Sequence, residues 1–290
     1  MRTSTATDQF EIVCRPQVRQ TASLPMYDLD GLRPATTAWW QGLARHFRAA
    51  GLAGVPPELS WPADRETHWR AAGLLFSQTC GFPLTHALSG ALRLVATPCY
   101  AAAGCAGPTY DSVVVVAETA AYAGPAELAG RRAAVNAWDS QSGCNALADL
   151  VAPQGGSGGA GGRFFAEVLV SGSHAASIAL VAAGRAEVAA IDCVVFALLA
   201  RHAPGRLAGV RTLCRTRPAP ALPYVTAAAS SDDDLARLRQ GLRAALADPA
   251  LEAVRGDLLI EDAAVLTLAD YDVIPRMAGG AGAAEVWGRC

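Results

Sequence analysis

The middle of the chain alternates between short apolar segments and segments whose apolar positions recur at helical spacing. The apolar segments are 132–135, 164–170 and 187–191, and the helical ones are 142–151, 175–183 and 194–201. Strands that alternate with helices of about ten residues are typical of a parallel sheet covered by helices on both faces. The pattern therefore predicts an α/β fold with a parallel sheet for this region.

Strands and helices are also predicted on both sides of this region. The expected strands are 22–27, 59–61, 92–97, 111–117, 207–213 and 224–228, and the expected helices are 35–50 and 235–247. The run DSVVVVA at 111–117 is rich in β-branched residues and suits a fully buried strand. In the helix at 35–50, Trp39, Leu43 and Phe47 recur at helical spacing, which places them on one face.

Two segments, near 112–118 and 208–216, divide the chain into an outer lobe made of two stretches and a lobe inserted between them. The predicted boundaries give 1–115 and 213–290 to the outer lobe and 116–212 to the inserted β/α lobe. Two chain segments that join two α/β lobes form a hinge around a cleft. The sequence thus predicts a two-lobed α/β protein with two hinge crossings.

The composition excludes several classes of function. Of the 290 residues, 52% are hydrophobic and 17% are charged, and the net charge is -2, which fits neither a disordered chain nor a basic nucleic-acid binder. We therefore expect no nucleic-acid partner. No apolar run is long enough to span a membrane, so we also expect no membrane span. All 24 basic residues are Arg, and without Lys there is no P-loop, pyridoxal phosphate Schiff base or lysine-activated serine.

The termini and cysteines give weaker indications. The first 20 residues contain no apolar core with a cleavage site, so the sequence as written predicts a cytoplasmic protein, and a periplasmic one if a leader was removed. The eight Cys residues form no C-x-x-C pair, although Cys99 and Cys105 are spaced to close a small disulfide loop in an oxidising compartment. The glycine-rich segment at 155–162 is interpreted as a surface loop, because no Lys follows it.

Two turns carry the same arrangement of small polar residues. In VNAWDSQSGCNAL a strand ends and Ser140, Ser142 and Gly143 open a helix, and in VLVSGSHAASIAL Ser173 and His174 open another. Hydroxyls and backbone amides at a helix N-terminus form an anion site, and α/β sheets bind ligands at the carboxyl ends of their strands. Each serine alone could be a plain helix cap. Two such turns in successive units favour a ligand site.

Asp192 ends the strand at 187–191 and is expected at the same edge of the sheet, either as a helix cap or beside the ligand. A carboxylate near an anion would accept a hydrogen bond from a protonated oxyanion and so favour that form. The pKa of His174 is expected to rise beside a bound oxyanion. Ser173, His174 and Asp192 do not match a hydrolase, because G-x-S-x-G is missing and adjacent Ser and His cannot easily pair.

Three adjacent Asp residues, 232–234, invite a metal-site interpretation. Neighbouring side chains diverge around a helix, so we interpret these residues as the first turn of the helix at 235–247. The sequence accordingly predicts no metal site, no cofactor and no catalytic residue.

Successive blocks of the chain, over roughly 22–275, resemble the phosphate/phosphite/phosphonate ABC-transporter substrate-binding proteins. The blocks are LPMYD, LLFSQTCGFPL, ATPCYAAAGCAGPTYDSVVVV, AVNAWDSQSGCNAL, VSGSHAASIALVAAGRAEVAAIDCVVFALL and ALPYVT. The resemblance implies the type II periplasmic-binding-protein fold, a small oxyanion such as phosphate or phosphonate as the ligand, and an ABC permease as the partner. Carried over by motif, it implies these ligand-binding residues: Ser140, Ser142, Gly143, Ser173, His174 and Asp192, with Tyr27 and Gln78 from the outer lobe. Tyr100 and Tyr224 are further candidates.

The alternative is an enzyme on the same fold, such as a menaquinone-pathway-type dehydratase that uses His174 or Asp192 as a base. A polar, cramped cleft would favour the anion, whereas an apolar, roomy cleft would favour a carboxylated ring. The related pyrimidine-synthesising proteins that consume their own lysine-bound cofactor are excluded, because the chain has no Lys.

Overall fold

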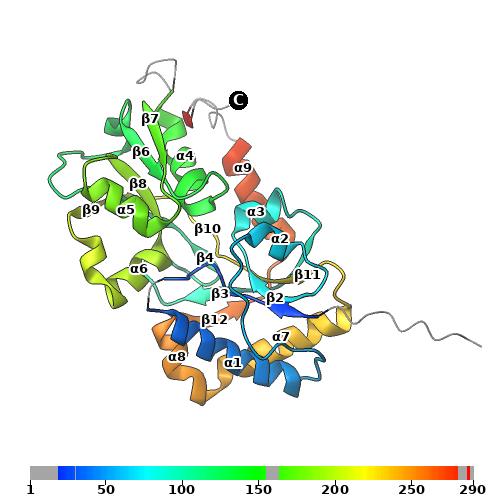
Figure 1. Cartoon of the computed structure of the whole chain (residues 1–290). Helices are drawn as coiled ribbons and strands as arrows, with labels where there is room; N and C mark the ends of the chain where they lie inside the picture. The colour runs from blue at the N-terminus through cyan, green and yellow to red at the C-terminus, as the bar shows by residue number, and fades with distance from the viewer. Residues whose placement is uncertain (1–18, 30, 155–162, 280–285, 288–290) are drawn as a thin grey trace, which may run out of the picture.

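The computed structural model describes residues 19–29, 31–154, 163–279 and 286–287. It consists of two lobes, each built on a five-stranded sheet with helices on its faces (Figure 1). The predicted two-lobed α/β architecture is therefore confirmed. The glycine-rich loop predicted at 155–162 lies outside the described residues.

The first lobe contains the sheet β1-β2-β11-β3-β12, in which β1 is parallel to β2 and the other neighbours are antiparallel. Its strands are β1 (Thr21–Ala22), β2 (Leu74–Gln78), β3 (Leu92–Tyr100), β11 (Tyr224–Ala227) and β12 (Ile260–Ala264). Its helices are α1 (Arg33–Ala49), α2 (Arg65–Trp69), α3 (Gly81–Thr85), α7 (Asp232–Ala247) and α8 (Glu252–Asp257), with 3-10 turns η5 (Pro249–Leu251) and η6 (Leu268–Asp272).

Helix α1 packs against α7 and α8 on one side of this sheet (Figure 1). Trp39, Leu43 and Phe47 of α1 are all buried, as their helical spacing predicted. Helix α7 is capped by Ser231, whose Oγ accepts the amide of Asp234 at 3.0 Å, and Asp232–Asp234 form its first turn. The interpretation of the three Asp residues as a helix start is thus confirmed.

The second lobe contains the sheet β7-β6-β8-β5-β9. Its strands are β5 (Ser112–Ala117), β6 (Arg132–Val135), β7 (Glu167–Val170), β8 (Val188–Asp192) and β9 (Val210–Arg215). Its helices are α4 (Ala146–Val151), α5 (His174–Ala182) and α6 (Cys193–His202), with a π-helical turn η2 (Gln141–Asn145) and 3-10 turns η1 (Pro125–Leu128), η3 (Ala152–Gln154) and η4 (Pro204–Leu207).

The prediction of a parallel sheet holds for only part of this lobe. Strands β7, β6 and β8 are parallel, but β5 runs antiparallel to both β8 and β9. The run of valines in β5 alternates between faces: Val113 and Val115 pack into the same core as α5, and Val114 and Val116 into the core that contains α4. A strand buried on both faces is apolar throughout whether its neighbours are parallel or antiparallel, so the pattern could not reveal the direction.

A short antiparallel ribbon joins the lobes. Strand β4 (Thr109–Tyr110) leads into β5, and β10 (Ala219–Pro220) follows β9; the two pair with each other between the lobes (Figure 1). The predicted boundaries at 115/116 and 212/213 fall inside β5 and β9, and both strands belong to the second sheet. We propose that the lobes divide just outside these strands, at the β4–β10 ribbon.

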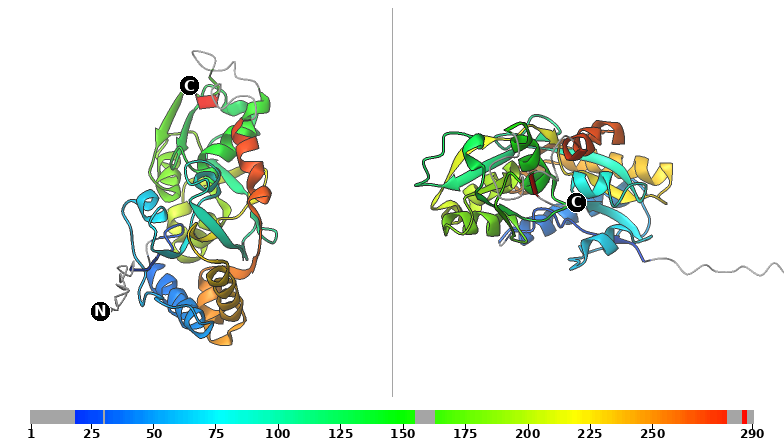
Figure 2. Two further views of the ribbon diagram at one scale, coloured as in Figure 1. Left: turned by 90° about the vertical axis from the view of Figure 1, so that its right-hand side faces the viewer. Right: turned by 90° about the horizontal axis from the view of Figure 1, so that it is seen from above.

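The C-terminal part of the chain returns to the second lobe, although the prediction gave all of 213–290 to the outer one. Helix α9 (Val273–Gly279) packs against α3 of the first lobe and against α4 of the second (Figure 2). Farther on, Val286 and Trp287 are buried in the core of the second lobe, where the Trp287 ring stacks on Phe165 with 5.3 Å between ring centroids. The C-terminal part is therefore a third connection between the lobes.

Candidate anion-binding site

A cleft of about 1050 Å³ lies between the lobes. Residues of both lobes line it, and the ones with a bearing on the site are Met26, Trp69, Cys80, Leu222, Asn136, Ser140, Ser142, Ser173, His174 and Asp192. This volume is at the upper end of the range for small-molecule sites, so size alone does not favour a small ion over a ring. The polar groups on its lining are more informative.

The first serine turn follows β6 and opens η2 and α4. Ser140 is the cap: its Oγ accepts the amide of Gly143 at 3.0 Å, and its carbonyl oxygen accepts the amides of Cys144 and Asn145. A side chain at Gly143 would collide with the amide oxygen of Asn136 and would approach His174 Cε1 to 3.1 Å. Glycine at this position therefore lets the two polar side chains lie against the backbone of the turn.

The second serine turn follows β7 and opens α5. Ser173 caps this helix by accepting the amide of Ala176 at 3.1 Å, and His174 is the first helical residue. Ser142 Oγ lies 3.0 Å from His174 Nε2, so a hydrogen bond joins the two turns directly. The cap interpretation holds for Ser140 and Ser173, and the expected convergence of the two turns is also observed.

His174 is uncharged at neutral pH in this structure. Burial lowers the pKa of His174 to about 4, and only a backbone contact from Ala190 acts in the other direction. The rise expected from the sequence was conditional on a bound oxyanion. The ring therefore offers hydrogen bonds to the cleft but no positive charge of its own.

Asp192 has both of the roles that its sequence position allowed. Its Oδ1 caps α6 by accepting the amides of Val194 at 2.7 Å and Val195 at 3.2 Å, while the side chain also lines the cleft. The Tyr27 hydroxyl, from the first lobe, donates to Oδ2 at 3.3 Å. Burial raises the pKa of Asp192 to about 7 despite the lowering effect of these three bonds. The carboxyl can therefore gain or lose its proton near neutral pH.

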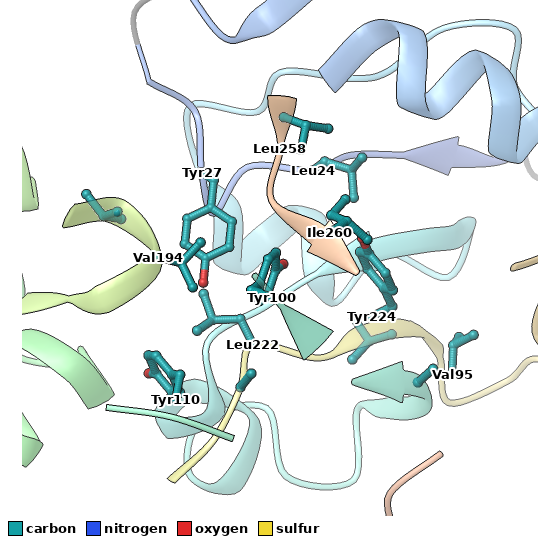
Figure 3. Packing of buried hydrophobic residues seen from close by; sticks show 14 of the residues in the cluster. Leu24, Tyr27, Val95, Tyr100, Tyr110, Val194, Leu222, Tyr224, Leu258 and Ile260 are labelled. Carbon is teal, nitrogen blue, oxygen red and sulfur yellow. The ribbon is translucent and has the colours of Figure 1, made fainter. Parts of the chain in front are cut away.

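The two outer-lobe candidates occupy different places. Tyr27 lies behind Asp192, with its ring 5.4 Å from that of Tyr100 in an edge-on contact, and Figure 3 shows both rings near Val194 and Leu222. Gln78 is buried, and its Nε2 donates to the Tyr100 hydroxyl at 2.8 Å and to the Leu222 carbonyl at 3.0 Å. The amide of Gln78 is therefore already bonded, and it is not among the residues that line the cleft.

Tyr224, the remaining candidate, lies away from the cleft. Its hydroxyl accepts the indole N–H of Trp39 at 3.3 Å, and its ring packs on Phe76 in the core of the first lobe. Packing inside the first lobe accounts for this tyrosine.

Three residues near the serine turns, Tyr110, Asn136 and Cys80, were not among the sequence candidates. The Tyr110 hydroxyl and Asn136 Oδ1 are buried and have no hydrogen-bond partner within the described part of the chain. Tyr110 is on the ribbon strand β4 and is not itself among the residues that line the cleft, but Cys80, Ser142 and Asp192, which do line it, are near its hydroxyl. Buried polar atoms are nearly always hydrogen-bonded, so unpaired ones beside a cleft favour a ligand site there.

Cys80 is the third such residue, and it connects the lobes at the site. Its sulfur accepts the backbone amide of Gln141, the first residue of η2, at 3.4 Å. Burial raises the pKa of Cys80 to about 11, so the thiol is neutral. Cys80 and Asn136 follow strands, as the serine turns do, and that position was the one signal from which the sequence could have identified them, whereas Tyr110 is the last residue of β4 and has no such signal.

Among the described residues, no group of three or more His, Cys, Asp and Glu side chains could hold a metal ion. In the same part of the chain, no helix has the length and apolar character needed to cross a membrane. The groups at the serine turns are thus hydroxyls, amides, the His174 imidazole and the Asp192 carboxyl. The lining of the cleft also includes the charged or titratable residues Asp28, Asp64, Arg65, Glu66, Asp139, His202 and Arg206.

Comparisons with known proteins bear on this site. The family model described as the ABC transporter, phosphonate, periplasmic substrate-binding protein matches residues 74–271. No curated protein matches the chain.

Solved structures match the fold over most of the chain. PhnD1 from Prochlorococcus marinus (MIT 9301), in complex with methylphosphonate, has a TM-score of 0.70 at 13% identity. The match covers 90% of this chain and 97% of the PhnD1 chain. A binding protein component of an ABC phosphonate transporter from Pseudomonas aeruginosa (PA3383) has a TM-score of 0.69 at 15% identity, covering 89% and 85%. XAC2383 from Xanthomonas citri, bound to a chloride ion, has a TM-score of 0.69 at 14% identity, covering 90% and 96%.

Proposed function

The chain belongs to the family of periplasmic substrate-binding proteins of phosphonate ABC transporters, and on that basis we propose that it holds the oxyanion group of a small phosphonate or phosphate where its two serine turns meet. The family consists of binding proteins, so the expectation that the chain is not an enzyme is confirmed and the dehydratase alternative is set aside. The residues that hold the ligand, and the choice among anions, are the proposal.

The unpaired buried atoms at the junction of the two turns carry this proposal. The N-termini of η2 and α5 both begin at the cleft, and helix N-termini attract anions through their amides and dipole. Tyr110 adds a buried hydroxyl without a partner among the described residues. We assign this hydroxyl as a donor to the ligand, because an anion would supply the missing acceptor.

Ser142 and His174 act together in this proposal. We assign the Nε2–H form to the imidazole, so that it donates to Ser142 Oγ over the observed 3.0 Å and leaves the serine proton free to bond to a ligand oxygen. A neutral imidazole suits this role, since burial lowers the pKa of His174 to about 4. The bond from the Ser142 hydroxyl to a charged ligand oxygen is charge-assisted, and such bonds are about twice as strong as neutral ones.

Asp192 would select the protonation state of the complex. A carboxyl with a pKa of about 7 can donate its proton to a fully ionised ligand, or accept the proton of a singly protonated one. In either case one proton is shared between Asp192 and the ligand. Loss of that proton places two negative groups together, which favours ligands that can keep a proton.

The family also bears on partner and compartment. We propose that the loaded protein delivers its ligand to an ABC permease, and that it does so in the periplasm, where its family works. The β4–β10 ribbon supports an opening and closing motion of the lobes around the cleft.

Titration calorimetry of the purified protein with methylphosphonate, phosphate and sulfate tests the proposal. We expect saturable binding of methylphosphonate or phosphate with one ligand per chain, and weaker binding of sulfate, which carries no proton at neutral pH. Saturable binding of none of the three anions, or binding that survives both Tyr110→Phe and Ser142→Ala unchanged, would contradict it.

A further inference from the structure

Two cysteine thiols meet at the boundary between the lobes. Cys105 is in the loop that leads from β3 to the ribbon strand β4, and Cys193 is the first residue of α6. Their sulfur atoms are 3.5 Å apart, although the residues are 88 positions apart in the sequence. The two thiols therefore belong to different structural units that the fold brings into contact.

The backbone around both thiols is held in place. The amide of Cys193 donates to the carbonyl of Asp111 at 3.2 Å, and the amide of Asp111 donates to the carbonyl of Gly104 at 3.1 Å. Arg215 bonds to the Asp111 carboxylate with both nitrogens at 2.7 Å, and it also donates to the carbonyl of Ala103. Asp111 thus connects the loop that carries Cys105, through Gly104, to the first residue of α6.

We propose that Cys105 and Cys193 are a disulfide-forming pair that links the interlobe loop to the second lobe under oxidising conditions. The reaction needs a disulfide oxidant, such as a thiol–disulfide exchange protein or oxidised glutathione. Cys105 is only half-buried and its thiolate attacks the oxidant, giving a mixed disulfide and one released thiol. Cys193 then attacks the Cys105 sulfur, forming the Cys105–Cys193 bond and releasing the second thiol. Two electrons and two protons pass to the oxidant.

The spacing of Cys99 and Cys105 left open a disulfide between them, and in this structure both thiols are free. Cys99 is buried within β3, where it is paired with Asp262 of β12. The sulfur of Cys105 contacts Cys193 instead. Short spacing suggested the first pair, and the tertiary fold favours the second.

Such a bond would close a large loop that contains most of the second lobe. Crosslinks across long loops restrict the unfolded chain more than short ones do, so the oxidised protein should be more stable than the reduced one. This inference does not depend on the identity of the ligand.

Peptide mapping tests the inference directly. The full-length protein is incubated with oxidised glutathione, its remaining thiols are alkylated, and it is cleaved after Arg without reduction. The expected product joins peptide 94–131, which holds Cys99 and Cys105, to peptide 186–201, which holds Cys193 alone. A reductant should separate the two peptides.

Two variants identify the sulfur in the first peptide. Cys99→Ser should keep the joined product, and Cys105→Ser should lose it. The oxidised wild type should melt about 5 °C above the reduced form, and Cys105→Ser should show no such difference. Full alkylation of both peptides after oxidation would overturn the inference, and so would a joined product in Cys105→Ser or a bond confined to peptide 94–131.

Discussion

Replacing Tyr110 with Phe separates a ligand-binding hydroxyl from a merely structural one. The side chain is buried at 2% exposure, and its hydroxyl has no hydrogen-bond partner among the described residues. The change removes only one oxygen and keeps the ring. Since this hydroxyl gives up no hydrogen bond to another described residue, we expect the melting temperature of the free protein to stay the same or to rise.

The effect on binding should be large. A hydrogen bond to a charged group is worth about 1.5–3 kcal/mol, and each 1.4 kcal/mol is a factor of ten in affinity. Tyr110→Phe should therefore weaken methylphosphonate binding by about tenfold to about a hundredfold. Calorimetric titration measures this change, with a thermal melt of each free protein beside it.

Tyr224→Phe is the matched control. Its hydroxyl is also buried, but it accepts the indole N–H of Trp39 inside the first lobe, whereas the Tyr110 hydroxyl is near Ser142 and Asp192 of the cleft lining. This variant should lose about 1 kcal/mol of stability and keep the wild-type affinity. If Tyr110→Phe binds as tightly as the wild type, the assignment of this hydroxyl to the ligand is refuted.

Three further changes test other parts of the structure. Ser142→Ala should weaken methylphosphonate binding about tenfold or more, whereas Ser177→Ala, which removes a buried hydroxyl bonded to Ser171 and outside the cleft lining, should lower only the melting temperature. Equal affinities for both variants would count against a role for Ser142. Wild-type affinity should fall as the pH rises through 7, because Asp192, whose pKa is raised by burial, loses its proton there. Asp192→Asn should flatten this fall in a series of titrations at different pH values, and an unchanged slope would exclude Asp192. Trp287→Ala should destabilise the protein by about 3 kcal/mol in urea unfolding, because it leaves a cavity where the indole ring stacks on Phe165. A loss below about 0.5 kcal/mol would mean that Trp287 does not anchor the C-terminal part to the second lobe.

The same pKa shift gives a stability prediction with a defined sign. Asp192 has a pKa of about 7 in the folded protein and an ordinary value near 3.8 when unfolded, so the folded state binds the proton more tightly. The stability that this proton contributes is complete below the unfolded value and is lost as the pH rises toward 7. His174 acts in the opposite direction: its pKa of about 4 makes stability fall as the pH drops from 6.5 toward 4.

The sequence determined the elements whose information is local. Apolar periodicity identified α1 and the β/α units of the second lobe, because the apolar residues of a helix or strand recur at the spacing of that element. The serine turns followed from the same logic: Ser140 and Ser173 stand where a strand gives way to a helix, and the carboxyl ends of the parallel strands β6 and β7 meet at one edge. That is why Ser142 and His174 could be placed together before any contact was known.

Tertiary structure decided whatever depends on a partner distant in the sequence. The direction of β5, the return of Trp287 to the second lobe and the contact between Cys105 and Cys193 all join segments that no period relates. The charge states belong to the same class, since the burial of His174 and Asp192 exists only when the lobes pack around them. A pattern along the chain records which face of an element is apolar, but the partner of that face, and the environment it creates, is fixed only by folding.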